Sequence, residues 1–491
     1  MTADLYRLAM AVLQPGYPGT TVPDWMRRAL GQGLGGVVLF ARNDPRAQVV
    51  AQIRAENPAA VVAVDEEGGA VTRFEVANGS SFPGNRALGV VDDVALTERV
   101  AREIGRMLAR SDVTLDYAPS ADVNANPANP VIGIRSFGPD PDLVARHTVA
   151  YVNGLQNAGV AACAKHFPGH GDTTTDSHLA LPTVHASREE LAERDLPPFR
   201  AAVAAGVRSI MCGHLLIPAL DPGLPATLSR PVLTDLLRGE LGFDGMLVTD
   251  AIEMQAVAAM FTPGEIAVRS LAAGVDAICA GMVTEEGLYE LRDAIVEAVK
   301  SGRLAEDRLA EAADRVAALS AWYTAQAPAR EIVTSEPDGG DVGLEAARAA
   351  LTATGSVTLT RPPLVVEVNT RFNQAVDPAT VTGITAALTT LLPGTTRVQM
   401  EAGGPLPRLG AGLAAKVGLG SSADRRPVVL VVHDAARHPW VRDRIAQAVQ
   451  ERPDVIVVDT GIAADPAGAV HLATHGISRV SAQAAAEWLT S

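Results

Sequence analysis

Short apolar runs alternate with amphipathic stretches over residues 1–325. The apolar runs are Leu8–Leu13, Gly35–Phe40, Val61–Val64, Thr114–Tyr117, Ala161–Lys165, Ser209–Cys212, Met246–Thr249 and Ala277–Cys279. Between them, apolar residues recur at helical spacing, for instance over Val94–Ser111, Pro141–Ala158, Arg188–Ala205 and Pro263–Ala273. Runs this short and this apolar are typical of strands buried on both faces of a parallel sheet. The pattern therefore predicts repeated strand–helix units.

Eight such units predict an α/β fold in which the strands close into a (β/α)8 barrel of the TIM type. A closed barrel has no edge strand, so it needs no further protection of the sheet. An open doubly wound sheet has the same alternation of strands and helices. The pattern alone therefore leaves these two architectures open.

The rest of the chain repeats the alternation on a smaller scale. The stretch 326–343 is polar and rich in Pro, Gly and Asp, which predicts a linker. After it come the apolar runs Leu364–Val368, Val428–Val432 and Val455–Val458, with helical spacing over Trp440–Glu451 and Ser481–Leu489. We expect a catalytic barrel domain over residues 1–325, a linker over 326–343 and a smaller C-terminal α/β sandwich domain over 344–491.

Composition narrows the classes of function. Of the 491 residues, 47% are hydrophobic, which is enough for a large core. The net charge of −15 argues against a general nucleic-acid binder, which needs a basic face. No apolar run reaches the roughly 18 residues that a membrane span requires. We therefore expect neither a nucleic acid nor a membrane as a partner.

The N-terminus and the cysteines predict a compartment. The segment MTADLYRLAMAVLQ is a poor signal peptide, because Asp4 stands where positive charge is needed and Arg7 interrupts the apolar run. The three cysteines, Cys163, Cys212 and Cys279, lie far apart and form no Cys-x-x-Cys pair. This usage suits a reducing environment. The sequence therefore predicts a cytoplasmic protein.

Polar residues gather where the predicted strands end. The active groups of α/β barrels lie on the loops that follow the strands, so polar side chains there are candidates for function. These loops begin Asp65-Glu66-Glu67-Gly68-Gly69, DYAPSADVNANPANPVIGIRSFG (116–138), Lys165–His170, Gly213-His214 and Thr249-Asp250. No motif organises the later histidines, which we interpret as ordinary structural or surface residues. They are His433, His438, His471 and His475.

The segment KHFPGHGDTTTDSH, residues 165–178, is the densest group of histidines and acids. In an extended loop, residues two apart project to the same side, so Asp176 can hydrogen-bond to His178. The carboxylate would orient the imidazole and raise its basicity, which suits proton transfer near neutral pH. Two other interpretations stay open, an ordinary exposed loop and a metal site. The histidines available to a metal are His166, His170, His178 and His214.

Asp250 ends a short buried strand in the segment GFDGMLVTDAIEM. An acid at this position can serve as a nucleophile, as a ligand or as the N-cap of the following helix. Asp65, after the apolar run VVAV, has the same ambiguity. Arg73, Arg135 and Lys165 supply positive charge on neighbouring loops of an acidic protein. Together they predict a pocket for an oxygen-rich ligand.

These segments resemble glycoside hydrolase family 3, specifically its β-N-acetylglucosaminidase branch. The matching segments are DEEGGAVTRF (65–74), LDYAPSADVNANPANPVIGIRSFG (115–138), KHFPGHGDTTTDSHLALP (165–182) and FDGMLVTDAIEM (243–254). They occur in the family's order and spacing, and the third is long and highly specific. The resemblance is strong over residues 1–320 and holds only in outline beyond them.

The resemblance implies a role for each matched residue. Asp250 corresponds to the catalytic nucleophile, His178 to the general acid/base and Asp176 to the acid that polarises this histidine. The positions that match binding of the terminal sugar are Asp65, Arg73, Arg135, Lys165 and His166. Many family members use a glutamate, often from a second domain, as the acid/base. The Asp-Ser-His loop therefore implies the histidine branch, in which the C-terminal region need not supply catalysis, and no cofactor or metal is expected.

The resulting hypothesis is a retaining exo-β-N-acetylglucosaminidase that removes terminal GlcNAc from muropeptides or related oligosaccharides. Its partner would be a small glycoside, and the protein a monomer or weak homo-oligomer. Retention requires a nucleophile and an acid/base about 5–5.5 Å apart around the anomeric carbon. A neutral imidazole does not repel an anion, so a phosphorylase that uses phosphate as the acceptor stays open. A metal-dependent hydrolase and a catalytically silent sugar-binding protein are the remaining alternatives.

Overall fold

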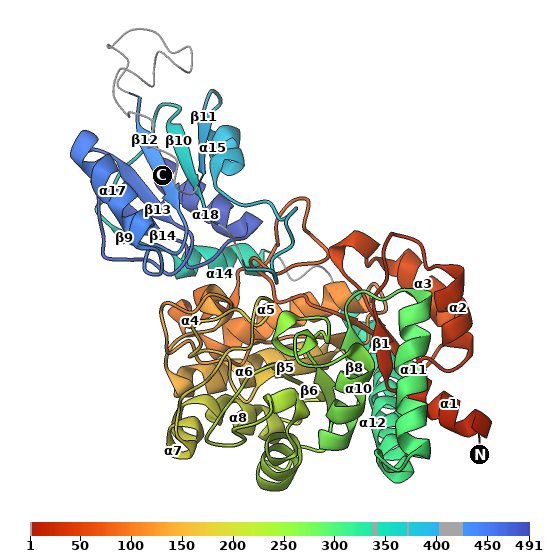
Figure 1. Ribbon diagram of the computed structural model, residues 1–491. Coiled ribbons are helices and arrows are strands. Elements are labelled where there is room, and N and C mark those ends of the chain that lie inside the picture. The colour runs from red at the N-terminus through yellow and green to blue at the C-terminus, as the bar shows by residue number, and fades with distance from the viewer. Residues whose placement is uncertain (1, 336–340, 371–372, 402–425) are drawn as a thin grey trace.

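The computed structural model describes residues 2–335, 341–370, 373–401 and 426–491. Figure 1 shows two bodies, each built on its own sheet, with helix α14 (Val342–Ala350) lying between them above α4 (Asn85–Val91) and α5 (Val94–Ala109). We call residues 2–325 the barrel and the described residues from Leu344 onward the second domain.

Eight strands of the described chain form the wall of the barrel. They are β1 Leu13–Pro15, β2 Gly36–Val38, β3 Val61–Val64, β4 Leu115–Asp116, β5 Ala161–Phe167, β6 Ser209–Cys212, β7 Met246–Thr249 and β8 Ile278–Ala280. Strands β2 to β7 pair in chain order, and β1 pairs with β8, all in parallel. A bridge between Val248 and Ala277 joins β7 to β8, and β1 packs beside β2. The sheet therefore closes on itself, which confirms the (β/α)8 prediction over the open sheet.

Helices cover the outside of the wall. In chain order they are α1 Thr2–Ala11, α2 Asp24–Gly31, α3 Ala47–Glu56, α4, α5, α6 Pro141–Asn157, α7 Arg188–Glu190, α8 Pro197–Ala204, α10 Pro263–Ala273, α11 Glu285–Lys300 and α12 Glu306–Ala325. The short helix α9 Gln255–Ala258, three 3-10 helices and two π-helices complete this part. The 3-10 helices are η1 Ala41–Asn43, η2 Gly133–Arg135 and η4 Ala226–Leu228, and the π-helices are η3 Leu191–Asp195 and η5 Pro231–Glu240.

Helix α5 shows how local sequence sets these elements. Its N-cap Asp93 accepts hydrogen bonds from the backbone N–H groups of Ala95 and Leu96, which satisfies donors that a helix start leaves open. Its buried residues Val100, Ile104 and Leu108 recur every four positions and so share one face. That face packs into the core between the strands and the helices.

The strand predicted at Leu8–Leu13 is wrong. Residues up to Ala11 belong to α1, and the first strand begins only at Leu13. The buried residues Leu5 and Ala9 lie four positions apart, which is the spacing of one helical face. Short apolar runs fit both helix and strand, and here the amphipathic spacing decides. The other seven predicted strands of the barrel overlap β2 to β8.

The second domain has a six-stranded sheet in the order β11-β10-β12-β13-β14-β9 within the described residues. The strands are β9 Thr352–Thr354, β10 Leu364–Asn369, β11 Thr396–Glu401, β12 Val428–Val432, β13 Ile456–Asp459 and β14 Val470–Ala473, of which only β9 runs antiparallel. Helix α17 (Pro439–Glu451) packs on one face, while α15 (Thr385–Leu391) and α18 (Arg479–Thr490) pack on the other. This is the smaller α/β domain that the sequence predicts.

The stretch predicted as a linker contains helix. Helix α13 runs over Ala327–Ser335, and α14 begins at Val342. Residues 336–340 of the predicted linker lie outside the described part of the chain. None of the helices in the described ranges is both long and apolar enough to cross a lipid bilayer.

Candidate active site

The strand ends of the barrel and the loops that follow them carry the eight catalytic and sugar-binding residues that the sequence predicts. Because parallel strands end on the same side of a barrel, these loops share one rim. Asp65 and Arg73 follow β3, Arg135 lies in η2 after β4, Lys165 and His166 lie in β5, Asp176 and His178 follow β5, and Asp250 follows β7.

Two buried cations and two acids form the base of this rim. The Lys165 ammonium lies 2.7 Å from Asp65 Oδ1 and 2.7 Å from Glu67 Oε1. Arg135 donates to both oxygens of Glu67, at 2.7 and 2.9 Å. Burial alone would raise the pKa of Glu67, but Arg135 and Lys165 outweigh it and hold this pKa well below its usual range. The structure thus brings Asp65, Lys165 and Arg135 together beside the ionised Glu67 carboxylate.

A tight turn returns Arg73 to this group. Gly68 and Gly69 take positive φ angles of 74° and 60°, and a Cβ on Gly69 would lie 2.6 Å from Gly84 Cα. The Glu66 carboxylate closes the loop by accepting from the Arg73 backbone N–H at 2.7 Å. The Arg73 guanidinium then lies 3.8 Å from Asp65 Oδ2.

The end of β5 carries two consecutive functional side chains. The pairing of β5 with β6 shifts register between Lys165 and Phe167. Such irregularities re-aim side chains, which otherwise alternate between the faces of a strand. His166 Nδ1 lies 2.8 Å from Asp122 Oδ2, and Asp122 is fully buried. Burial would raise the pKa of Asp122, but His166 outweighs it and lowers this pKa.

Asp176 and His178 form the pair that the sequence predicts. Asp176 Oδ1 lies 2.8 Å from His178 Nδ1 and accepts from the His178 backbone N–H at 2.9 Å. With Nδ1 bonded to the carboxylate, Nε2 is the ring atom left for proton exchange. Burial would raise the pKa of Asp176, but the hydrogen bonds from His178 outweigh it and lower this pKa. The intervening Ser177 bonds to His170 Nε2 at 3.0 Å, which ties the loop to the end of β5.

Asp250 lies beside this pair. The Ala256 backbone N–H, in the short helix α9 that follows Asp250, donates to the Ser177 carbonyl at 3.2 Å. Burial would raise the pKa of the Asp250 carboxyl, but three imidazoles outweigh it and lower this pKa. They belong to His166, His214 and His178. The carboxylate is therefore ionised and lies within the electrostatic influence of both predicted histidines of the site.

Two of the four histidines considered as metal ligands, His170 and His214, use both ring nitrogens in hydrogen bonds. His170 bonds through both ring nitrogens, to Thr173 at 2.8 Å and to Ser177 at 3.0 Å. His214 does the same, with Thr227 at 2.7 Å and the Ala251 carbonyl at 3.0 Å. Burial lowers the pKa of His170 to about 4, so this ring is neutral. Within the described ranges, no group of three or more His, Cys, Asp or Glu is arranged around a metal position.

Two residues of the site were missed by sequence reasoning. Glu67 holds Arg135 and Lys165, and Asp122 holds His166. Both are acids that follow a barrel strand, and both lie inside segments already identified as matching. An acid so close to a strand end signals a buried partner, but the sequence does not say which cation or imidazole it meets.

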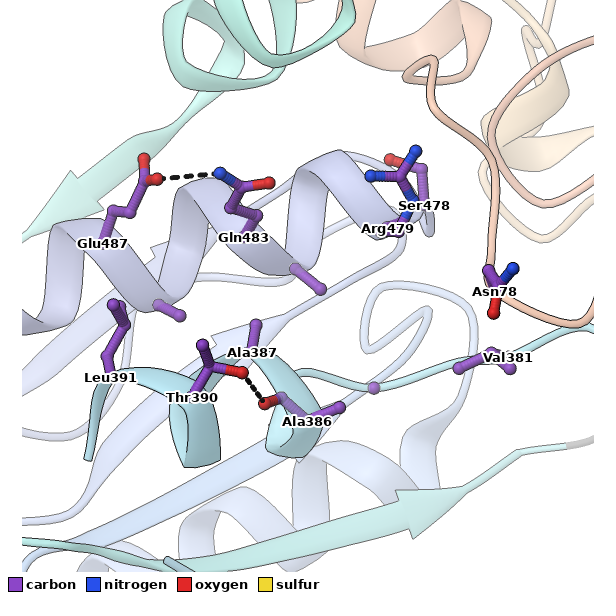
Figure 2. A pocket seen from close by; sticks show the side chains of 13 residues that line it. Asn78, Val381, Ala386, Ala387, Thr390, Leu391, Ser478, Arg479, Gln483 and Glu487 are labelled. Atoms are coloured by element: carbon purple, nitrogen blue, oxygen red, sulfur yellow. Dashed lines mark hydrogen bonds between the residues drawn. The ribbon is translucent and has the colours of Figure 1, made fainter. Parts of the chain in front are cut away.

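A separate hollow of about 440 Å³ lies in the second domain, between α15 and α18 (Figure 2). Its lining contains none of the eight predicted residues. Two of its polar contacts are internal, Gln483 to Glu487 at 3.0 Å and Thr390 to the Ala386 carbonyl at 3.2 Å. The candidate catalytic and sugar-binding residues therefore lie on the barrel rim and not in this hollow.

Known proteins match this arrangement. The model of the glycosyl hydrolase family 3 N-terminal domain matches residues 24–319. Beta-hexosaminidase A of Pseudoalteromonas piscicida is 34% identical over 336 residues, which cover 61% of this chain and 55% of that protein. Beta-hexosaminidase of Stenotrophomonas maltophilia (strain K279a) is 36% identical over 285 residues, or 55% of this chain and 82% of that protein.

Solved structures extend the match over both domains. A glycoside hydrolase family 3 β-N-acetylglucosaminidase from Paenibacillus sp. str. FPU-7 is 34% identical, with a TM-score of 0.84 over 99% of this chain and 96% of that one. The beta-glucoside phosphorylase BglX, at 18% identity and a TM-score of 0.78, shares the fold. The chain therefore belongs to glycoside hydrolase family 3 and is a glycoside hydrolase.

Proposed function

We propose that this protein is a retaining exo-β-N-acetylglucosaminidase in which Asp250 is the nucleophile, His178 the general acid/base and Asp176 the acid that orients His178. One observation carries the proposal: an ionised Asp250 lies within the electrostatic reach of an imidazole whose Nδ1 is bonded to a carboxylate. Relatives named beta-hexosaminidase, at about 35% identity, support an N-acetylhexosaminide as the substrate.

The first step breaks the glycosidic bond. A carboxylate oxygen of Asp250 attacks the anomeric carbon and forms a glycosyl-enzyme ester, while His178 Nε2 donates its proton to the departing oxygen. Asp176 stabilises the protonated imidazole and keeps Nδ1 occupied, so the proton leaves from Nε2.

The second step restores the enzyme. His178, now neutral, takes a proton from water, whose oxygen attacks the anomeric carbon and releases Asp250. Each of the two steps inverts the configuration of the anomeric carbon, so the product retains the configuration of the substrate. Phosphate in place of water would give the sugar 1-phosphate, which is the phosphorylase alternative.

The terminal sugar would bind on the charged base of the rim. Asp65, Arg73, Arg135, Lys165 and His166 offer acceptors and donors for its hydroxyls and acetamido group. The proposed physiological substrate is a peptidoglycan-derived muropeptide or a related oligosaccharide with terminal GlcNAc.

The test is a paired assay with nitrophenyl GlcNAc and nitrophenyl glucoside. We expect the first to be cleaved with at least about tenfold higher kcat/KM, the usual cost of leaving a buried polar group unmatched. Equal turnover of the glucoside would contradict the N-acetyl assignment. Mass and anomeric analysis of the product with and without phosphate separates GlcNAc from GlcNAc 1-phosphate.

A further inference from the structure

The second domain contacts the barrel next to two proposed sugar-binding arginines. The contact is made by residues 373–376, which lie between β10 and α15. Val376 packs with Ala70 and Val71 of the barrel turn and with Ile477 of its own domain. The two bodies seen in Figure 1 therefore meet at the loop that leads to Arg73.

The position of the Arg73 guanidinium depends on this contact between the domains. Among the described residues, its guanidinium donates one hydrogen bond, from Nη2 to the Ala375 carbonyl at 3.0 Å. The Asp65 oxygen lies farther away, at 3.8 Å. The Nε donor of Arg73 is buried and bonds to no described atom. The backbone of the second domain therefore holds the guanidinium through Nη2.

The loop that carries Arg135 is held from the same side. The Val131 carbonyl accepts from Arg135 Nη1 at 3.2 Å and from Asn373 Nδ2 at 3.2 Å. Arg437, before α17, donates to the neighbouring Pro130 carbonyl at 3.3 Å. The Val131 carbonyl of the barrel thus orients Arg135, and Asn373 of the second domain orients this carbonyl.

Asn373 links the two arginines. Its Oδ1 accepts from the Ala375 backbone N–H at 3.0 Å, and the Val376 N–H bonds to the Asn373 carbonyl at 3.2 Å. This turn presents the Ala375 carbonyl to Arg73, while Nδ2 of the same side chain reaches Val131. Loss of Nδ2 alone would affect the Arg135 loop, and loss of the whole amide would affect both arginines.

We propose that the second domain completes the sugar-binding site, with Asn373 as the positioning residue for Arg73 and Arg135. The inference rests on the proposed function, because the arginines act only when the terminal sugar is bound. It assigns the second domain a role in substrate affinity and none in proton transfer. Variants of Asn373 should therefore raise KM and leave kcat nearly unchanged.

Two substitutions in the full chain separate the two arms of the contact. Asn373→Asp keeps Oδ1 and the turn but removes the donor to Val131, and we expect about a fivefold rise in KM for nitrophenyl GlcNAc, the cost of one hydrogen bond. Asn373→Ala removes the turn as well, and we expect a rise of more than about tenfold. In an Arg135→Lys background, Asn373→Asp should add nothing, since both act on the same group.

Glu345→Ala is the matched control. It removes another contact between the domains, the 2.6 Å ion pair with Arg99, which lies between α5 and α14 and touches neither arginine of the site. We expect its KM and kcat to equal those of the parent. If Asn373→Ala does not fold, Arg437→Ala tests the same loop through Pro130.

Failure of the proposed function and failure of the positioning role give different results. A parent that does not cleave nitrophenyl GlcNAc overturns the proposed function. A parent that cleaves it, with folded Asn373 and Arg437 variants of unchanged KM, overturns the positioning role. An equal rise of KM in Glu345→Ala also overturns it, because the effect would then follow from loosening the domains in general.

Discussion

Two carboxylate–imidazole pairs contain the histidines that lower the pKa of Asp250, and the two pairs differ in their surroundings. Asp122 and His166 approach to 2.8 Å with exposed side-chain fractions of 0% and 7%, while Asp176 and His178 approach to 2.8 Å with fractions of 9% and 23%. The contact distance is the same. The difference lies in what else holds each acid.

Asp122 is fixed from several directions. It accepts from the backbone N–H groups of His166 at 3.2 Å and His170 at 2.7 Å and from the Ser120 hydroxyl at 3.0 Å. Asp176, by contrast, bonds through its carboxylate to its own loop neighbour His178. The comparison teaches that the same two side chains suit different tasks: the fully buried pair suits holding a ligand group in place, and the pair with the more accessible imidazole suits the proton exchange proposed for His178.

Removing the Asp250 carboxylate should reduce turnover more than any other substitution. Asp250→Ala deletes the proposed nucleophile, and we expect kcat to fall by at least about ten-thousandfold. Steady-state rates with nitrophenyl GlcNAc measure this, and an unchanged Tm excludes unfolding as the cause. A loss below about tenfold would assign the nucleophile elsewhere.

The Asp122–His166 pair should contribute more to the free energy of unfolding than the Asp176–His178 pair. Asp122→Ala leaves His166 and two backbone donors without their acceptor, at a cost of roughly 3–5 kcal/mol in the free energy of unfolding. The folded-state pKa of Asp122 lies below its ordinary value of 3.8. Its contribution is therefore complete above that ordinary value and is lost as the pH falls through the folded-state pKa.

Denaturant unfolding between pH 3 and 7 tests this. Asp176→Ala is the control, and we expect it to cost less than about 1.5 kcal/mol, since its carboxylate bonds to His178 alone among the described residues and that imidazole is partly exposed. Equal losses in the two variants would remove the distinction between the pairs.

The Asp176–His178 pair should control proton transfer. Asp176→Asn removes the carboxylate that bonds to His178 Nδ1, and we expect roughly a hundredfold loss of kcat/KM for a substrate with a sugar leaving group. Steady-state rates with that substrate measure this. A loss below about tenfold would show that His178 does not need Asp176 for its proposed role.

Much of the barrel could be predicted from the sequence. Parallel strands buried on both faces must be apolar, so β3, β6 and β7 match their predicted bounds residue for residue. Leu8–Leu13 failed because a short apolar run at the start of a chain fits a helix equally well. The helix α13 inside the predicted linker shows that polar composition does not forbid local helix.

The contacts of the site could be predicted only in part. The Asp176–His178 bond follows from a two-residue spacing. The partners of Glu67, Asp122 and Arg73 lie between about 40 and 300 positions away, so only the fold reveals them. Long-range pairing of this kind leaves no local periodicity in the chain.

The most direct test of the account compares leaving groups in His178→Ala and His166→Ala. If His178 donates the proton, its loss should reduce kcat/KM about a thousandfold for a sugar or alkyl leaving group but less than about tenfold for nitrophenol, which departs without a proton. His166→Ala should reduce both substrates equally, because it holds the sugar common to them. Equal losses for both leaving groups in His178→Ala would contradict the assignment of His178 as the acid.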